Sequence, residues 1–198
     1  MSDLNQLAEL HGTDKRDNSH GYCQLYDRYF KGYRAKPCTL LEMGVAQGSS
    51  LRMWRDWMPL ATVVGFDRGV YQHGANDGPR VRTFNGSQKS VEDLNRLLAE
   101  FPSFDIIVDD AGHEPEFQLI AFNHLWPRVK PGGWYVVEDI MSGHDPEQET
   151  VWFQATSREA VNDLLGGGKA VEFHLHSEGV NSFNERGNGI LFLRKRRE

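Results

Sequence analysis

From residue 39 onward, short apolar runs alternate with longer stretches whose apolar residues recur at helical spacing. The runs at 39–43, 62–66, 81–84, 105–108 and 134–138 predict strands, and the patterns at 50–57, 91–100 and 116–126 predict helices between most of them. A strand, helix and strand in succession favour parallel pairing, because the helix carries the chain back along the sheet. The sequence therefore predicts an α/β fold with a doubly wound sheet.

Both ends of the chain depart from this alternation. Two further strands, at 171–176 and 189–194, are separated by a polar segment, which predicts an antiparallel hairpin. Helical patterns at 4–10 and 22–33 precede the first strand. At 198 residues the chain has room for one domain. We expect an N-terminal helical cap at 1–36 and a Rossmann-like core at 37–198, with a mostly parallel seven-stranded sheet that ends in the hairpin.

Bulk composition excludes several kinds of partner. The formal net charge of −6 argues against nucleic acid, and the basic run at 194–197 is expected to be a solvated end of the last strand. No apolar run approaches the ~20 residues of a membrane span, and the first residues lack the pattern of a signal peptide. The two cysteines have neither metal-site spacing nor the density of a disulfide scaffold. We therefore expect a cytoplasmic protein without nucleic-acid or membrane partners.

Two of the predicted strands end in pairs of acidic residues. Asp109 and Asp110 follow one apolar run, and Glu138 and Asp139 follow another. Because the carboxyl ends of parallel strands meet at one edge of the sheet, these acids are expected to converge where such folds bind ligands. Converging carboxylates without a nearby cysteine favour a hard divalent cation such as Mg²⁺. His113, three residues after Asp110, is the natural candidate for a general base.

Each of these residues also has a structural explanation. Asp109 is expected to cap the next helix or to bond backbone amides rather than to bind a cation. The other three acids could form a solvated cluster, but without a cation they would repel one another and raise their pKa values. His113 could be a surface residue at the start of a helix.

A glycine-containing loop follows the first strand. Gly44 and Gly48 lie at a predicted helix N-terminus, where glycine lets the backbone approach a ligand. The dinucleotide fingerprint G-x-G-x-x-G needs its middle glycine where Ala46 stands, so nicotinamide binding is disfavoured. Asp67 ends the next strand, at the place where α/β folds hold a ribose. A nucleoside cofactor without a pyrophosphate fits both observations, and a plain strand-to-helix turn is the alternative for the loop alone.

The run from Glu42 to Gly48 resembles the E-x-G-x-x-x-G loop of class I S-adenosylmethionine-dependent methyltransferases. The Pro131-Gly132-Gly133 segment, expected as a turn, and the closing hairpin follow the same template. The resemblance implies S-adenosylmethionine as the cofactor, with Asp67 on the ribose hydroxyls. The residues that we predict to bind the cofactor are Thr13, Tyr22, Glu42, Gly44, Gly48, Ser49, Asp67, Ser87, Gln88 and Asp109.

Several short motifs together resemble a narrower family, the metal-dependent sugar O-methyltransferases of macrolide and related antibiotic pathways, whose pattern the cephalosporin hydroxylase-like proteins share. The motifs are Gly12-Thr13-Asp14-Lys15, His20-Gly21-Tyr22, Leu41-Glu42-Met43-Gly44-Val45, Asp109-Asp110-Ala111-Gly112-His113 and Val137-Glu138-Asp139. The resemblance implies that Asp110, Glu138 and Asp139 hold the metal and that His113 is the base. It also implies that the segment 13–22 folds over the cofactor.

The implied activity is S-adenosylmethionine-dependent, Mg²⁺-assisted O-methylation of a hydroxyl group on a small natural product, with a sugar as one candidate acceptor. Two alternatives stay open: a metal-independent N-methyltransferase of a small amine, and a cofactor-binding accessory subunit without turnover. The relatives carry additional segments around the acceptor site. The segment 140–169 is expected to supply a helix beside the pocket, and completion of the site by a second subunit of a homo-oligomer is also compatible with the sequence.

Overall fold

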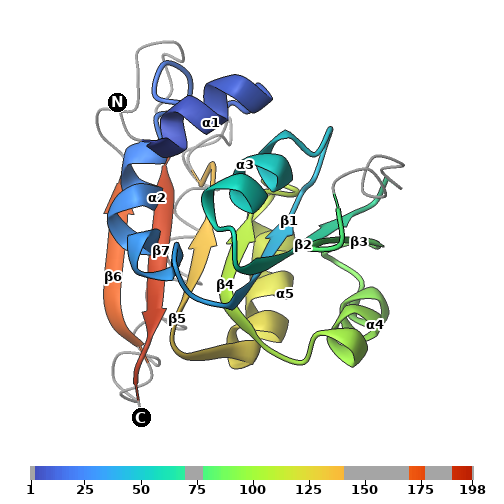
Figure 1. The fold of residues 1–198 in the computed structure, drawn as a ribbon. Coiled ribbons are helices and arrows are strands. Elements are labelled where there is room, and N and C mark those ends of the chain that lie inside the picture. Colours follow the sequence, from blue (N-terminus) through green and yellow to red (C-terminus); the bar gives the residue numbers. More distant parts are fainter. Residues whose placement is uncertain (1–2, 70–77, 141–169, 177–188, 198) are drawn as a thin grey trace.

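The computed structural model describes residues 3–69, 78–140, 170–176 and 189–197. Within these residues one sheet runs through the molecule in the order β3-β2-β1-β4-β5-β7-β6 (Figure 1). Its strands are β1 (Cys38–Met43), β2 (Ala61–Asp67), β3 (Val81–Asn85), β4 (Phe104–Asp109), β5 (Val129–Val137), β6 (Ala170–His176) and β7 (Ile190–Lys195). The first five pair in parallel, and β7 pairs antiparallel with both β5 and β6. The predicted α/β fold with an antiparallel C-terminal pair is confirmed.

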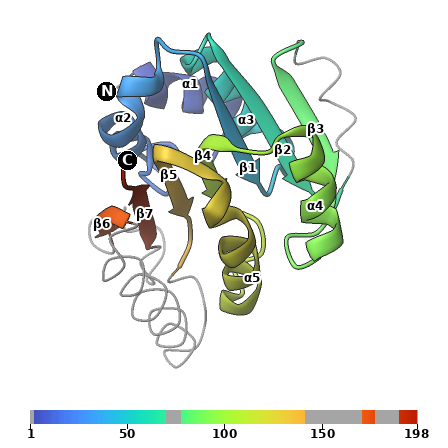
Figure 2. The same cartoon turned by 90° about the horizontal axis from the view of Figure 1, so that it is seen from below.

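Helices cover both faces of the sheet (Figure 2). One face carries α1 (Asp3–His11), α2 (Cys23–Phe30) and α3 (Ser49–Trp57), and the other carries α4 (Val91–Glu100) and α5 (Pro115–Leu125). Short 3₁₀ helices, η1 (Lys31–Tyr33) and η3 (Trp126–Arg128), extend α2 and α5. The helix expected at 22–33 is therefore an α-helix up to Phe30 and a 3₁₀ helix from Lys31 to Tyr33.

Strand alternation divides the core into two layers. Leu40 packs among α1, α2 and α3, whereas its neighbour Leu41 packs among α4 and α5. On the first face, Tyr26 and Phe30 of α2 are buried against the ring of Phe192. The same alternation decides which acid of each pair at the strand ends faces which layer.

The Pro131-Gly132-Gly133 segment lies inside β5, so the prediction of a turn before this strand was wrong. Val129 opposes Phe104 and Trp134 opposes Ile106, and the residues between them on β5 face a single residue of β4. Gly132 has φ +78°, a conformation that glycine adopts at little cost. The segment is a bulge that interrupts the β4–β5 register.

The basic run at 194–197 was expected to be solvated, and this expectation was wrong for its first two residues. Lys195 lies in β7, and its ammonium donates to the backbone oxygens of Pro127 at 3.0 Å and Val129 at 2.7 Å. The guanidinium of Arg194 lies 5.3 Å from the centre of the Trp134 ring. These cations stabilise the carbonyl groups that follow α5 and cover an aromatic side chain of the core.

The helix expected within 140–169, and the polar segment between the last two strands, lie outside the described residues for almost all of their length. Among the helices that the structure describes, none is long and apolar enough to cross a membrane.

Candidate functional site

The carboxyl ends of β1, β2, β4 and β5 surround a cavity of about 500 Å³. Asp67, Asp110, His113 and Asp139 line it, together with the N-terminal segment 12–15. A smaller cavity of about 100 Å³, which includes Ser87 and Gln88, shares three lining residues with the larger one: Gly44, Asp67 and Ala111. The sizes suit a small ligand that extends from one cavity into the other.

Gly44 brings two strand ends into contact. It has φ +85°, and a Cβ built at this position would lie 1.9 Å from the backbone oxygen of Asp110. The Gly44 amide donates to Phe66 O at 2.9 Å, and the Asp110 amide donates to Met43 O at 2.9 Å. A glycine at this position is therefore required by packing, whatever else the loop binds.

Asp67 is held by the loop that follows β1. Its Oδ2 accepts from the amides of Val45 at 2.6 Å and Ala46 at 3.1 Å, and its Oδ1 accepts from the amide of Gly69 at 2.9 Å. Partial burial disfavours the charged form, but these backbone hydrogen bonds outweigh it and lower the pKa of Asp67. An ionised carboxylate is thus fixed where both cavities meet.

Gln88 links the smaller cavity to the loop that follows β4. Its side chain accepts from the amide of Gly112, and its Nε2 lies 3.4 Å from Asp109 Oδ1. Asp109 is fully buried on the α4–α5 face, where Tyr135 donates to its Oδ2 at 3.4 Å. Burial raises the pKa of Asp109 well above its usual range. Asp109 was predicted to contact the cofactor, but it lines neither cavity. The alternation of side chains along β4 turns it away from the site.

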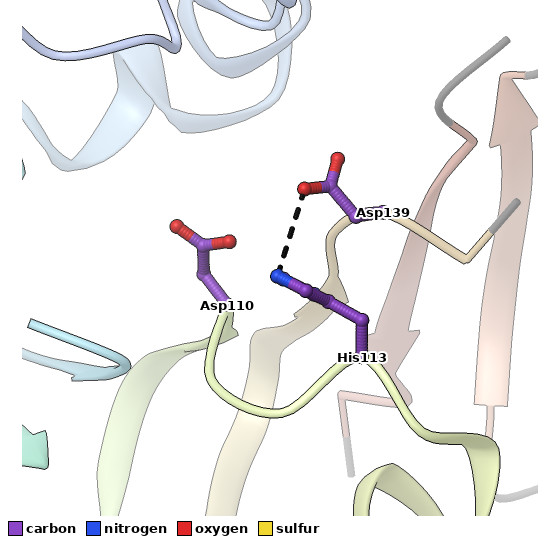
Figure 3. A group of neighbouring side chains, drawn as sticks. All are labelled: Asp110, His113 and Asp139. Carbon is purple, nitrogen blue, oxygen red and sulfur yellow. Dashed lines mark ion pairs between the residues drawn. The ribbon is translucent and has the colours of Figure 1, made fainter. Parts of the chain in front are cut away.

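Asp110, His113 and Asp139 form the group in Figure 3. One ligand atom from each lies within 4.8 Å of the others, and His113 Nε2 is 3.9 Å from Asp139 Oδ2. Asp139 has φ +54°, a left-handed conformation that is uncommon outside glycine. This conformation, two residues after the end of β5, accompanies a side chain that lines the cavity.

Glu138 lies apart from this group. Its side chain is buried on the α1–α3 face, where Lys15 Nζ lies 2.8 Å from Oε2 and the hydroxyl of Tyr26 donates to Oε1. Lys15 also contacts Asp110 Oδ2 at 2.5 Å and Glu42 Oε1 at 3.5 Å. The predicted ligand set of Asp110, Glu138 and Asp139 is therefore divided by a buried ammonium group.

The charges of this cluster depend on one another. Burial disfavours the charge on Lys15, but the carboxylates of Asp110, Glu138 and Glu42 outweigh it and hold the pKa of Lys15 well above its ordinary value. Burial raises the pKa values of these three acids, while Lys15 acts in the opposite direction. Lys15 thus remains an ammonium group inside the molecule.

Four other predicted cofactor residues differ in whether they line the large cavity or lie buried behind it. Thr13 lines the large cavity, as does Ser49 at the start of α3. Tyr22 is fully buried and donates to Asp139 Oδ1 at 2.6 Å. Glu42 is also buried, and accepts from Ser50 Oγ at 2.6 Å. Tyr22 and Glu42 therefore support the site from behind rather than line it.

Gly48, the last of the predicted cofactor residues, precedes α3 with φ +72° and lines neither cavity. Lys15 was not predicted to have a role of its own. Its place in the Gly12-Thr13-Asp14-Lys15 motif was the available signal, but periodicity gives no sign that a lysine in a polar stretch is buried.

Residues 41–140, just over half of the chain, match the family model described as a methyltransferase domain. The chain belongs to this family. The matched residues begin in β1 and end directly after Asp139, so they include the glycine loop, Asp67 and both acidic pairs.

Two curated relatives are O-methyltransferases. The 8-demethyl-8-(2-methoxy-alpha-L-rhamnosyl)-tetracenomycin-C 3'-O-methyltransferase of Streptomyces olivaceus is 34% identical over 183 residues, which cover 89% of this chain and 46% of the relative. The mycinamicin VI 2''-O-methyltransferase of Micromonospora griseorubida is 34% identical over 73% of this chain and 37% of the relative. The chain thus spans less than half the length of these relatives.

Solved structures show the same fold. MycE methyltransferase from the mycinamycin biosynthetic pathway, in complex with Mg, SAH and mycinamycin VI, superposes with a TM-score of 0.84 at 28% identity, over 99% of this chain and 55% of MycE. The O-methyltransferase TomG from Streptomyces achromogenes gives a TM-score of 0.60 at 18% identity, over 98% of this chain and 90% of TomG. The second likeness concerns the fold alone.

Proposed function

We propose that this chain is an S-adenosylmethionine-dependent O-methyltransferase that uses Mg²⁺ and acts on a sugar hydroxyl of a small natural product. One observation carries the proposal: a single cavity is lined both by Asp67 and by Asp110, His113 and Asp139. An acid suited to a ribose and a base suited to a hydroxyl thus face the same space. The names of the relatives, and the Mg and SAH bound to MycE, support the same assignment.

The proposed cofactor contacts lie along the two joined cavities. Asp67, already oriented by three backbone amides, would accept hydrogen bonds from the ribose hydroxyls. Ser87 and Gln88 would lie at the adenine end, and Thr13 and Ser49 line the larger space. S-adenosylmethionine supplies an electrophilic methyl group when it is bound. Asp67 and the adenine-end residues would fix its orientation, so that the acceptor oxygen, methyl carbon and sulfur can align.

His113 would take the proton from the acceptor hydroxyl. A free sugar hydroxyl has a pKa far above seven, so its attack needs a base within reach. The His113 imidazole lines the cavity and is partly exposed, and Asp139 lies 3.9 Å from its Nε2. His113 is thus placed to accept a proton from a hydroxyl group that is bound in the cavity.

The donor set fits a hard cation in part. Asp110 and Asp139 offer carboxylate oxygens to the cavity, and their ligand atoms lie within 4.8 Å of each other. Glu138 is engaged by Lys15 and Tyr26, so it would join them only after a change of side-chain partners. Mg²⁺ bound by Asp110 and Asp139 would lower the pKa of a substrate hydroxyl.

Calorimetry tests the proposal directly. S-adenosylmethionine is titrated into metal-stripped protein and again after addition of Mg²⁺, with NAD as the control ligand. We expect binding of S-adenosylmethionine but not of NAD, and a separate heat of Mg²⁺ binding that Asp110→Ala abolishes. Asp56→Ala is the matched variant, because Asp56 bonds His11 outside both cavities. No binding of S-adenosylmethionine under either condition would refute the proposal.

A further inference from the structure

Lys15 has no role in the chemistry proposed above, yet it occupies the centre of the acidic cluster. Its side chain is fully buried, and its Nζ lies 2.5 Å from Asp110, 2.8 Å from Glu138 and 3.5 Å from Glu42. Burial of an ammonium group is costly unless carboxylates surround it, and here three of them do. The fold therefore places a built-in cation where two of the predicted metal ligands meet.

A divalent cation that used both Asp110 and Glu138 would need the oxygens that Lys15 now contacts. Two cations at such short range repel each other strongly in a buried site. We propose that Lys15 is the resident counter-cation of this cluster and competes with the divalent cation for Asp110 and Glu138. This inference rests on the proposed function, because it assumes that the cation binds at Asp110 and that Glu138 can join the ligands.

Glu42 can remain the ion-pair partner of Lys15 when a divalent cation binds to Asp110 and Glu138. Ser50 Oγ donates to Glu42 Oε2 at 2.6 Å and Trp54 Nε1 lies 3.3 Å from Oε1, so this carboxylate is fixed against α3. Glu42 lines neither cavity. A small shift of Nζ toward Glu42 releases Asp110 and Glu138 without leaving the ammonium group unpaired. Competition of this kind weakens cation binding but does not exclude it, because the acids still outnumber Lys15.

The test is a titration of the full chain with Mn²⁺, followed by the electron paramagnetic resonance signal of the free ion. Lys15→Met keeps the length of the side chain and removes its charge. We expect it to bind Mn²⁺ at least about tenfold more tightly than the wild type, because the repulsion is gone. Lys130→Met is the matched control, since it removes a lysine that pairs with Asp105 at 2.8 Å outside both cavities, and its affinity should equal that of the wild type.

The outcomes separate this inference from the proposed function. If the wild type binds Mn²⁺ and Lys15→Met binds it equally or more weakly, the competition is refuted while the cation site stands. If neither protein binds Mn²⁺, the competition and the cation site of the proposed function are both refuted, while binding of S-adenosylmethionine is tested separately.

Lys15→Met also leaves three buried acids without their counter-charge, so its fold is checked by circular dichroism. If the variant is unfolded alone, Mn²⁺ must restore its fold, because the ion then supplies the missing positive charge. Failure to do so, in this variant and in Lys15→Gln, refutes the inference.

Discussion

Tyr22 donates its hydroxyl hydrogen to Asp139 across 117 residues of sequence, at 2.6 Å. Tyr26 donates to the neighbouring Glu138, and Lys15 contacts Glu138 and Asp110. The N-terminal segment thus supplies the groups that orient the acids at the ends of β4 and β5. The positions of these carboxylates therefore depend on side chains of the N-terminal segment as well as on the strands that carry them.

Tyr22→Phe should lower the free energy of unfolding by about 1.5–3 kcal/mol, because it removes a buried hydrogen bond to a charged acceptor. Urea denaturation measures the loss. Tyr33→Phe is the control, since Tyr33 donates to the backbone oxygen of Gly132 at 2.9 Å and should cost only about 0.5–1.5 kcal/mol. Equal losses in the two variants would contradict a stronger hydrogen bond from Tyr22 to Asp139 than from Tyr33 to a backbone carbonyl.

The carboxylate of Asp67 should stabilise the fold in a pH-dependent way. Its pKa in the folded chain is lowered by the amides that it accepts from, so its contribution is fully present above the unfolded pKa and is lost as the pH falls through the folded one. We compare the free energies of unfolding of the wild type and Asp67→Asn from neutral pH to below the ordinary pKa of aspartate, about 3.9. A difference that stays constant over this range would contradict the assignment.

The same substitution should weaken S-adenosylmethionine binding about tenfold or more, because the asparagine nitrogen cannot accept a hydrogen bond. Calorimetric titration gives the dissociation constant. Asp105→Asn is the matched variant, since Asp105 also accepts from a backbone amide, that of Thr39 at 2.8 Å, but lies outside both cavities. Unchanged binding by Asp67→Asn would remove this residue from the proposed ribose site.

His113→Gln should reduce methyl transfer by about 100-fold or more while leaving cofactor binding intact, which is the expected loss for a general base. Transfer of a labelled methyl group to an acceptor, found by screening glycosylated natural products, measures the rate. His20 provides the control, because its Nδ1 also lies near Asp139, at 3.8 Å, but it does not line the large cavity. His20→Gln should keep most of the activity, and similar losses in both variants would contradict a specific role for His113.

Gly44→Ala should destabilise the protein by more than about 2 kcal/mol, because it adds a clash to the cost of a left-handed backbone. Gly12→Ala separates the two effects, since Gly12 has φ +71° but nothing within 4 Å of a built Cβ. This control should lose only about 1–2 kcal/mol. Thermal and urea denaturation of both variants give the comparison, and equal losses would mean that the loop relaxes away from Asp110.

The strands and helices could be predicted because their signals are local. Apolar runs and helical spacing located β1 to β4 to within a residue at each end, but only the second half of β5. They could not show that Lys130 to Gly133 form a bulge inside this strand, since the sequence alone does not fix register. The contacts of Lys195 with backbone carbonyls escaped prediction for a similar reason. A terminal run of basic residues looks solvated until the neighbouring carbonyl groups are placed beside it.

The sequence predicts where the site lies better than it predicts which side chains contact one another there. Topology brings strand ends to one edge, so the meeting of Asp67, Asp110 and Asp139 around one cavity follows from their positions after strands. The burial of Lys15 and the separation of Glu138 from the group depend on long-range contacts of Glu138, with Lys15 before α2 and with Tyr26 in α2, which no local pattern records.

The two acids of each pair at the ends of β4 and β5 are not equivalent. In each pair one carboxylate is buried in the protein, Asp109 on one face of the sheet and Glu138 on the other, while Asp110 and Asp139 open to the cavity. A slip of either strand by a single residue would exchange these positions, so that the anchored carboxylate and the accessible one trade places. The doubled acids are therefore not spare copies of one function: in each pair the first carboxylate is anchored inside the protein, and the second is the one that a ligand in the cavity can reach.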